Sequence, residues 1–168
     1  MPPSEPNPDK ALMIAASRGS AQAVQVLLDR GAVANARDAN TGATPLIIAA
    51  AGGHTEVARV LLRNGADPGA KDRESGLNSL MIAAAKAYTD FVELLLDEGA
   101  AVDERAEEGH TALMVAAAGG HNDTVKLLLA RGADANARNE LGWTASMYAD
   151  TNGHSETVAL LKEAGAEG

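Results

Sequence analysis

The sequence predicts an all-α repeat protein, a solenoid in which helix-turn-helix units stack side by side. An alanine-rich apolar segment recurs five times, headed by Leu12, Leu46, Leu80 and Leu113, with Ser146 in the fifth copy. A Gly-Ala pair closes each copy, with its glycine at positions 31, 65, 99, 132 and 165. Both series advance in steps of 34, 34, 33 and 33 residues. The sequence therefore predicts an array of repeated units, each packed against its neighbours.

The composition supports thin, closely packed units. Hydrophobic residues make up 46% of the chain, which is enough for a core, but aromatic residues account for only 2%. Short alanine-rich helix pairs meet this condition, because small side chains let stacked helices approach closely. The absence of cysteine excludes disulfides, thiolate metal sites and a cysteine nucleophile.

The second copy shows how each unit is built. Thr44 is placed to cap a short helix that starts at Pro45, whose fixed backbone angle and missing N–H suit the first helical position. Gly53 permits the left-handed turn that reverses the chain. A second helix follows with apolar residues such as Val57 and Leu61 at helical spacing. Helices of two or three turns do not persist alone in water, so each pair depends on stacking.

The motifs of these copies resemble the ankyrin repeat. The second copy reads Thr-Pro-Leu-Ile-Ile-Ala-Ala over residues 44–50, then Gly53-His54, Leu61-Leu62 and Gly65-Ala66-Asp67, and the fourth copy matches it over residues 111–136. The resemblance covers about residues 9–166. It implies an ankyrin solenoid of stacked helix-turn-helix units with protruding β-hairpin loops, used as a protein-binding surface.

One position departs from the family throughout the chain. The family's usual histidine after Thr-Pro-Leu is replaced by Met13, Ile47, Met81, Met114 and Met147. We expect an apolar stacking ladder at this position, since a row of methionines is more often core than a set of ligands. In this respect the chain is similar to prokaryotic ankyrin arrays more than to animal ones.

The resemblance predicts one ankyrin repeat domain over residues 9–168, with repeats at about 9–38, 39–72, 73–105, 106–138 and 139–168. Residues 1–8, which include four prolines, are expected to form a flexible N-terminal tail, and Asp9 is expected to cap the first helix. At the other end, Ser146, Asp150 and Lys162 replace apolar residues, which predicts an exposed final face.

The third repeat departs most from the family pattern. Asn78-Ser79 replaces Thr-Pro, Ala87 replaces the turn glycine and Tyr88 replaces the histidine that follows it. The first two hairpins are also one residue longer than the next two. These irregularities favour the middle of the array as a contact region, although neutral drift would produce the same pattern.

The charge is acidic and uneven. The net charge is -9, and the acidic window between Thr89 and Glu108 holds eight acidic residues against Arg105 alone, or -7 of that total. This balance argues against nucleic-acid binding, which requires cations to neutralise phosphates. It favours a basic protein partner.

No apolar run approaches the length of a membrane span, and the first residues lack the features of a signal peptide. The sequence therefore predicts a cytoplasmic, monomeric protein that does not enter a membrane, with removal of a signal peptide left open.

The sequence contains no recognisable catalytic constellation. His54, His121 and His154 recur after the turn glycine, so they are expected to lie far apart and to make structural hydrogen bonds. No phosphate-binding glycine loop and no metalloprotease or hydrolase motif occurs. We expect no metal, no cofactor and no catalytic residue, and an enzyme is the less favoured alternative.

A cation recurs at the entry to each hairpin, at Arg37, Lys71, Arg105 and Arg138. Recurrence at one place favours a structural task, such as pairing with nearby acids or backbone carbonyls, over contact with a partner.

The surface implied by the family consists of the hairpin tips and the exposed side of the first helices. Large side chains there are the candidate partner-binding residues, because such residues concentrate binding energy. They are Arg18, Leu77, Lys86, Tyr88, His110, Trp143 and Tyr148. Trp143 has an equally favoured role as a cover for the end of the stack. The predicted function is non-catalytic binding of a protein partner, and the alternative is a structural or engineered scaffold without a natural ligand.

Overall fold

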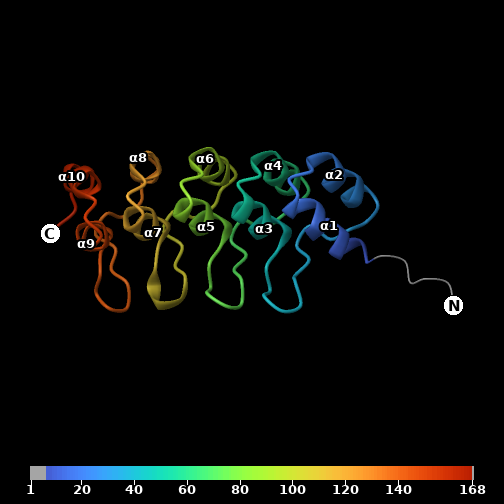
Figure 1. Ribbon diagram of the computed structural model, residues 1–168, viewed down its shortest axis with the longest axis horizontal. Helices are drawn as coiled ribbons and strands as arrows, with labels where there is room; N and C mark the ends of the chain where they lie inside the picture. Colours follow the sequence, from blue (N-terminus) through green and yellow to red (C-terminus); the bar gives the residue numbers. More distant parts are fainter. Residues whose placement is uncertain (1–6, 168) are drawn as a thin grey trace.

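The computed structural model describes residues 7–167, which form a row of five helix pairs. Figure 1 shows the pairs side by side, with the second helices in a row above the first helices and the loops extending below. The first helices are α1 (Pro8–Ser17), α3 (Pro45–Gly52), α5 (Ser79–Ala85), α7 (Ala112–Ala118) and α9 (Ala145–Thr151). The second helices are α2 (Ala21–Asp29), α4 (Thr55–Arg63), α6 (Thr89–Asp97), α8 (Asn122–Ala130) and α10 (Ser155–Glu163). A short 3₁₀ turn, η1 (Glu107–Gly109), lies in the third loop.

Polar side chains start the first helices as the sequence predicted. Thr44, Thr111 and Thr144 each accept a hydrogen bond from the backbone N–H three residues on, at 3.3, 3.4 and 3.3 Å. Asn78 does the same for α5 at 3.0 Å. The change from threonine to asparagine therefore keeps the cap, because both side chains offer an oxygen acceptor.

The first helix begins earlier than expected. Asn7 is its N-cap, with the side-chain oxygen accepting the Asp9 N–H at 2.9 Å, and Pro8 occupies the first turn. The expectation that Asp9 is the cap is therefore wrong. Its carboxylate instead accepts the Val33 N–H at 2.8 Å and ties α1 to the first loop. Residues 7 and 8 of the predicted tail thus belong to the start of α1, and residues 1–6 lie outside the described residues.

The turn inside each helix pair is left-handed. Gly53 has φ 69°, and Ala87 holds the same conformation in the third repeat with φ 59°. The turn of the third repeat has therefore kept its shape and is not rebuilt around Tyr88. A residue with a Cβ pays about 1 to 2 kcal/mol in this region.

The core is a thin layer between the two rows of helices. Leu46 and Leu80 are completely buried, and so are the alanine pairs at 49–50 and 83–84. Met81 and Met114 are also buried, which confirms the apolar ladder at the position of the family's histidine. Alanine pairs let α3, α5 and α7 contact one another in series along the row.

The final repeat carries the predicted polar residues, but not all of them face solvent. Asp150 and Lys162 are exposed. Ser146 is 5% exposed, so its expected place on the outer face is wrong. The physical reason is that Ser146 shares the buried side of α9 with Ala145 and Ala149, where α7 and α10 pack.

The loops have the shape of hairpins without strands. Each is closed by one backbone hydrogen bond across its base, for example from the Asp38 N–H to the Ala43 carbonyl at 2.9 Å. Within residues 7–167 the only bridge of β type pairs Lys71 with Asn78. The predicted β-hairpins are therefore reduced to loops held by side chains, which are described below.

Replacing Ala87 with glycine should raise the free energy of unfolding by about 1 kcal/mol, because glycine relieves the strain of the positive φ. Urea unfolding followed by circular dichroism measures the change. Gly53→Ala is the matched control and should destabilise, since its Cβ would lie 3.0 Å from the Tyr88 ring. An unchanged or lower free energy of unfolding for Ala87→Gly would show that the positive φ of Ala87 does not strain the fold.

Deleting residues 139–168 should promote aggregation. The deletion removes α9 and α10, which cover α7 and α8, and so exposes apolar side chains such as Leu113, Val125 and Leu128. Light scattering at matched concentrations compares the truncated and full chains. Unchanged solubility would show that the last repeat does not cap the array.

Candidate functional site

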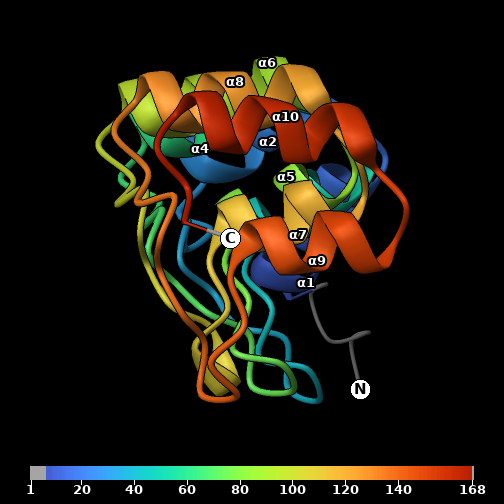
Figure 2. The ribbon, with the colours of Figure 1, turned by 90° about the vertical axis from the view of Figure 1, so that its left-hand side faces the viewer.

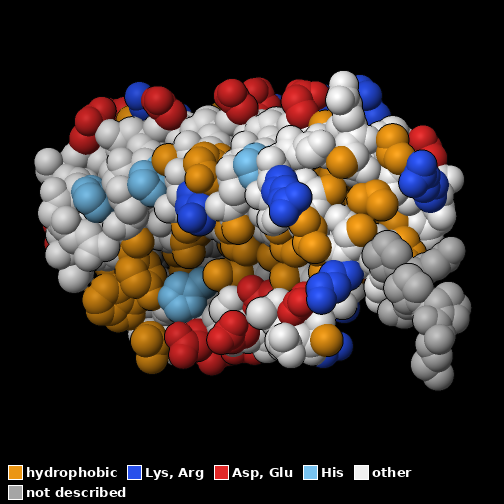
Figure 3. Space-filling model, turned by 45° about the vertical axis from the view of Figure 1, so that its right-hand side comes forward, with side chains coloured by type: hydrophobic (Ala, Val, Ile, Leu, Met, Phe, Trp, Pro, Cys, Tyr) orange, Lys and Arg blue, Asp and Glu red, His pale blue; other side chains and the backbone are white. Residues whose placement is uncertain are grey.

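A groove runs along the array between the first helices and the loops. In Figure 2 the loops descend beside the first helices. Two hollows lie between these elements, one lined from α1 and the first loop and one lined from α7 and the second and third loops. Figure 3 shows hydrophobic side chains in a band across this face, with basic and histidine side chains above and acidic ones at the loop tips below. One position on the first helices carries a half-buried or exposed apolar or aromatic side chain in every repeat: Ile14, Ile48, Ile82, Val115 and Tyr148. Of these, Val115 lines a hollow beside the third loop and Tyr148 contacts His110 of that loop.

The cations at the loop entries hold the loops in place. Arg37 donates to the Gly42 carbonyl of its own loop at 3.0 Å and to the Lys71 carbonyl of the next repeat at 2.8 Å. Arg105 repeats this pattern with the carbonyls of Gly109 and Arg138. The predicted structural task of these cations is confirmed, and it fixes the spacing of the loops that form one wall of the groove.

Carboxylates shape the tips of the first two loops. The Asp38 side chain accepts hydrogen bonds from the Thr41 N–H, the Thr41 hydroxyl and the Asn40 N–H, and these bonds lower its pKa. Burial alone would raise the pKa of Asp72. Hydrogen bonds from the N–H and hydroxyl of Ser75, with those from neighbouring N–H groups, outweigh burial and lower the pKa of Asp72 below its ordinary value.

The histidines that follow the turn glycines join adjacent repeats. His54 Nε2 lies 3.1 Å from the Ser17 carbonyl, and His121 Nε2 lies 2.9 Å from the Ala85 carbonyl. His154 makes the equivalent contact with Ala118. Each ring therefore bonds to the end of the preceding first helix, which confirms a structural role and places it between repeats.

Three candidate residues lie at the helix ends that form the upper edge of the groove. Arg18 and Lys86 are exposed C-cap residues of α1 and α5. Tyr88 takes the place of the histidine, and its ring covers Gly53, at 3.0 Å from where a Cβ would stand. Tyr88 thus packs between repeats, whereas the two cations are free to meet a partner.

Three other candidates come together near the C-terminal end of the groove. The rings of Trp143 and Tyr148 are 5.1 Å apart and tilted, and the His110 ring is 5.7 Å from Tyr148. His110 Nε2 lies 2.9 Å from the Tyr148 hydroxyl. These residues come from two loops and α9, so the fold builds an aromatic cluster from residues 38 positions apart.

Asn139 holds this aromatic cluster together and was not among the predicted site residues. It is 6% exposed, donates to the Tyr148 hydroxyl at 2.9 Å and accepts the Trp143 N–H at 2.9 Å. The signal for it was its position, because Asn139 occupies the place that Asp38 and Asp72 hold in the first two loops.

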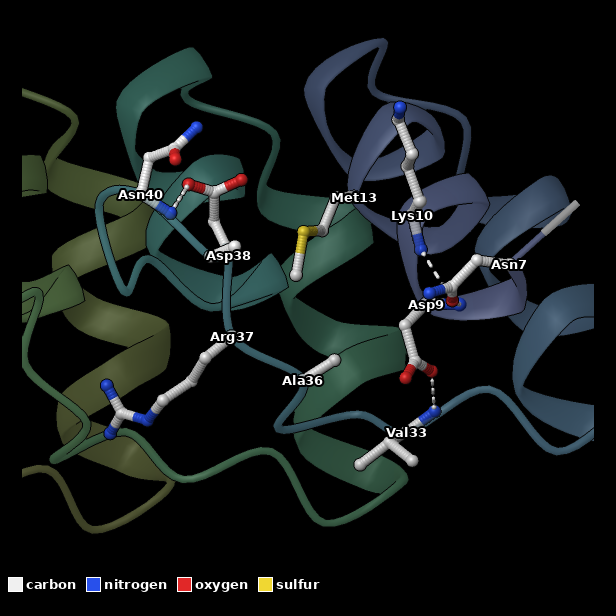
Figure 4. A pocket seen from close by; sticks show the side chains of 10 residues that line it. Asn7, Asp9, Lys10, Met13, Val33, Ala36, Arg37, Asp38 and Asn40 are labelled. Carbon is white, nitrogen blue, oxygen red and sulfur yellow. Dashed lines mark hydrogen bonds between the residues drawn. The ribbon is translucent and has the colours of Figure 1, made fainter.

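Leu77 and His110 line a hollow of about 320 Å³ between the second and third loops, which we call the loop cleft. Its walls are Ser75, Leu77, Ala106, Glu107, Glu108, His110 and Val115. A second hollow of about 430 Å³ lies at the N-terminal end, between α1 and the first loop (Figure 4). Asn7, Asp9, Met13, Val33 and Asp38 are among its lining residues.

The acidic window does not form one surface. Glu93 and Asp97 on α6 pair with Arg131, at 3.3 and 2.7 Å, and Glu104 pairs with Lys71 at 2.6 Å. These acids therefore join neighbouring repeats.

Five other acids of the acidic window have no ion pair among residues 7–167. Asp103 accepts the Asp134 N–H at 3.0 Å and so also joins neighbouring repeats, and the remaining four divide between two places. Asp90 and Glu98 lie on and just after α6, whereas Glu107 and Glu108 lie at the tip of the third loop. Figure 1 places α6 and this tip at opposite edges of the array. Only the tip acids border the groove.

Comparison with protein families matches the chain to ankyrin repeats (3 copies) over residues 2–72 and 78–168. The chain belongs to the ankyrin repeat family. A search of curated proteins finds no match. Ankyrin repeats generally serve as protein-protein interaction modules and are typically non-catalytic.

Two further findings concern the part of the ankyrin array that the structure describes. No helix there is long and apolar enough to cross a membrane. No group of three or more histidine, aspartate or glutamate side chains is arranged there to hold a metal ion.

Replacing Asp72 with asparagine should reduce the loss of stability in acid. The pKa of Asp72 is lower in the folded state than in the unfolded chain, so its stabilising contribution is present above the unfolded pKa and disappears as pH falls through the folded pKa. Asparagine keeps an acceptor oxygen but does not titrate. Urea midpoints at about pH 6 and about pH 2 should therefore differ less for Asp72→Asn than for the parent. Asp123→Asn on α8 is the control, and an unchanged difference at Asp72 would refute the assignment.

Proposed function

We propose that this ankyrin array is a non-catalytic module that binds a protein partner along the groove. The observation that carries the proposal is the partly exposed apolar band of the first helices, which continues into the aromatic cluster at Trp143 and Tyr148. A partner would bury this surface against the helices and loops, and large aromatic side chains contribute strongly to such interfaces.

Seven residues are the proposed contacts, and their positions along the groove support the proposal. Leu77, His110, Trp143 and Tyr148 supply apolar and aromatic area toward the C-terminal half of the groove. Lys86 and Arg18 add charge at its upper edge, and Tyr88 supports that edge by packing on the preceding repeat. The interface would be centred on repeats three to five.

The partner is proposed to be basic. Glu107 and Glu108 border the groove without ion pairs among the described residues, so a cationic partner would meet uncompensated negative charge. The net charge of -9 would also raise the rate at which such a partner arrives.

We also propose that the protein acts as a monomer in the cytoplasm. The absence of cysteine means that the fold works without disulfides, which suits a reducing compartment. Size-exclusion chromatography with light scattering tests the monomer, and fractionation of the source cell tests the location.

Lys86→Ala should speed dissociation of a partner captured from the source cell, by about threefold to tenfold, because it removes an exposed contact at the groove edge. Lys126→Ala on the outer side of α8 is the matched control and should leave the rate unchanged. Surface plasmon resonance measures both. Equal dissociation rates for the two variants would show that the partner does not bind at the groove. A structural scaffold without a groove ligand would then be the better interpretation.

Charge reversal should separate local steering from the effect of total charge. Glu107→Lys with Glu108→Lys should slow association more than Asp90→Lys with Glu98→Lys, although both pairs change the net charge equally. Association rates at low and high salt make the comparison. Equal slowing would show that only the total charge matters, and no slowing would remove the steering proposal.

A further inference from the structure

The two hollows of the groove differ in whether their acids are already engaged. In the N-terminal hollow, Asp9 accepts the Val33 N–H, and Asp38 accepts three hydrogen bonds from its own loop. Figure 4 shows both carboxylates turned toward these protein donors. This hollow therefore offers little free negative charge to a ligand.

The loop cleft is different. Its acids, Glu107 and Glu108, make no side-chain hydrogen bond or ion pair among residues 7–167. Its other side is apolar, formed by Leu77 and Val115, both half-buried. The hollow, of about 320 Å³, thus has an apolar wall and an acidic rim.

This combination matches an amphipathic cation. Arginine has an aliphatic stem that packs on apolar surface and a guanidinium that remains in a polar environment. The stem would lie along Leu77 and Val115, and the guanidinium would meet the glutamates at the rim. We propose that the loop cleft binds an arginine side chain from an extended basic segment of the protein partner, an inference that rests on the proposed function.

The glutamate pair favours arginine over lysine. A guanidinium presents several N–H donors in a plane and can bond to two oxygens at once, whereas an ammonium acts as a compact point charge. Arginine also stacks on aromatic faces, and the His110 ring lines the same cleft. The contact of the His110 ring with Tyr148 links the cleft to the aromatic cluster.

The position of the rim is fixed by the next repeat. The Glu140 N–H donates to the Glu108 carbonyl at 2.8 Å, which holds the third and fourth loop tips together. The backbone that carries the glutamates is therefore already held in place, so binding loses less conformational entropy. Beyond the cleft, the segment would continue over Trp143 and Tyr148, where an apolar side chain can pack.

Four capped pentapeptides provide the probe: Ala-Leu-Arg-Leu-Ala and its analogues with lysine, citrulline or glutamate at the centre. Citrulline has nearly the shape of arginine but no charge. Trp143 is the only tryptophan of the chain, so its fluorescence reports on the aromatic cluster beside the cleft. Amide chemical shifts of residues 106–110 report on the cleft itself.

The arginine peptide should bind about fivefold to tenfold more tightly than the citrulline peptide, with lysine between them and glutamate weakest. Shifts should appear at residues 106–110 and at the Trp143 indole. Glu107→Gln with Glu108→Gln should abolish the preference for arginine over citrulline. Asp90→Asn with Glu98→Gln on and after α6 removes the same charge and should preserve it. Thermal melts check that the parent and both double variants remain folded.

The proposal is overturned if arginine and citrulline bind equally, if no peptide shifts these amides up to about 10 mM, or if the α6 control loses the preference as well. Failure of the proposed function is a separate result, because it is read from the captured partner with Lys86→Ala. A partner that depends on Lys86 while the arginine peptide does not bind would refute the arginine site alone. Peptide binding with a partner insensitive to Lys86 would refute the groove as the partner's site.

Discussion

The close stacking of small first helices is the constraint on which the rest of the molecule depends. Helices of seven to ten residues are not stable alone, so each must pack against neighbouring helices. Fully buried alanine pairs such as Ala49 and Ala50 allow neighbouring helices to meet along the row. The loops below can contact one another only because this spacing is short, and the groove exists because all loops leave the helices on the same side (Figure 1).

Hydrogen bonds between repeats extend this constraint beyond the core. His54 and His121 bond to the ends of preceding helices, and Arg37 and Arg105 bond to carbonyls of the following loops. Asn35 adds a further link, donating to the Gly65 carbonyl and accepting the Asp67 N–H. These bonds satisfy backbone groups that the short helices and strandless loops leave free. They also fix the positions of the loop tips relative to the helices, as a binding surface requires.

Positions that differ between repeats make the two ends of the groove chemically different. The first loop uses Asp38 to organise its own tip, and the fourth uses Asn139 to orient Trp143 and Tyr148. In the third loop the corresponding residue is Ala106, and Glu108 adopts φ 59°. The carboxylates at that tip therefore remain open to a ligand, whereas the Asp38 carboxylate of the first loop already accepts hydrogen bonds from its own loop. A repeat array can therefore vary one loop without disturbing the stack, since each unit contacts only its neighbours.

The sequence by itself determined the array, the order of its helices and the positions of its caps and turns. Periods of 34 and 33 residues, Thr44 before Pro45 and a glycine or Ala87 at each turn are local signals, and local backbone preferences decide these features. Local pattern also misled in two places, since Asn7 caps α1 and Ser146 is buried.

Only the tertiary structure decided which candidate residues meet. It joined His110 to Tyr148 and revealed Asn139 as their support, while it placed Lys86 at the C-terminal end of α5. It also divided the acidic window between α6 and the tip at Glu107. Residues 30 to 40 positions apart become neighbours through the stacking of whole repeats. Their side-chain partners therefore depend on the shape of each loop and on inter-repeat hydrogen bonds, which periodicity does not encode.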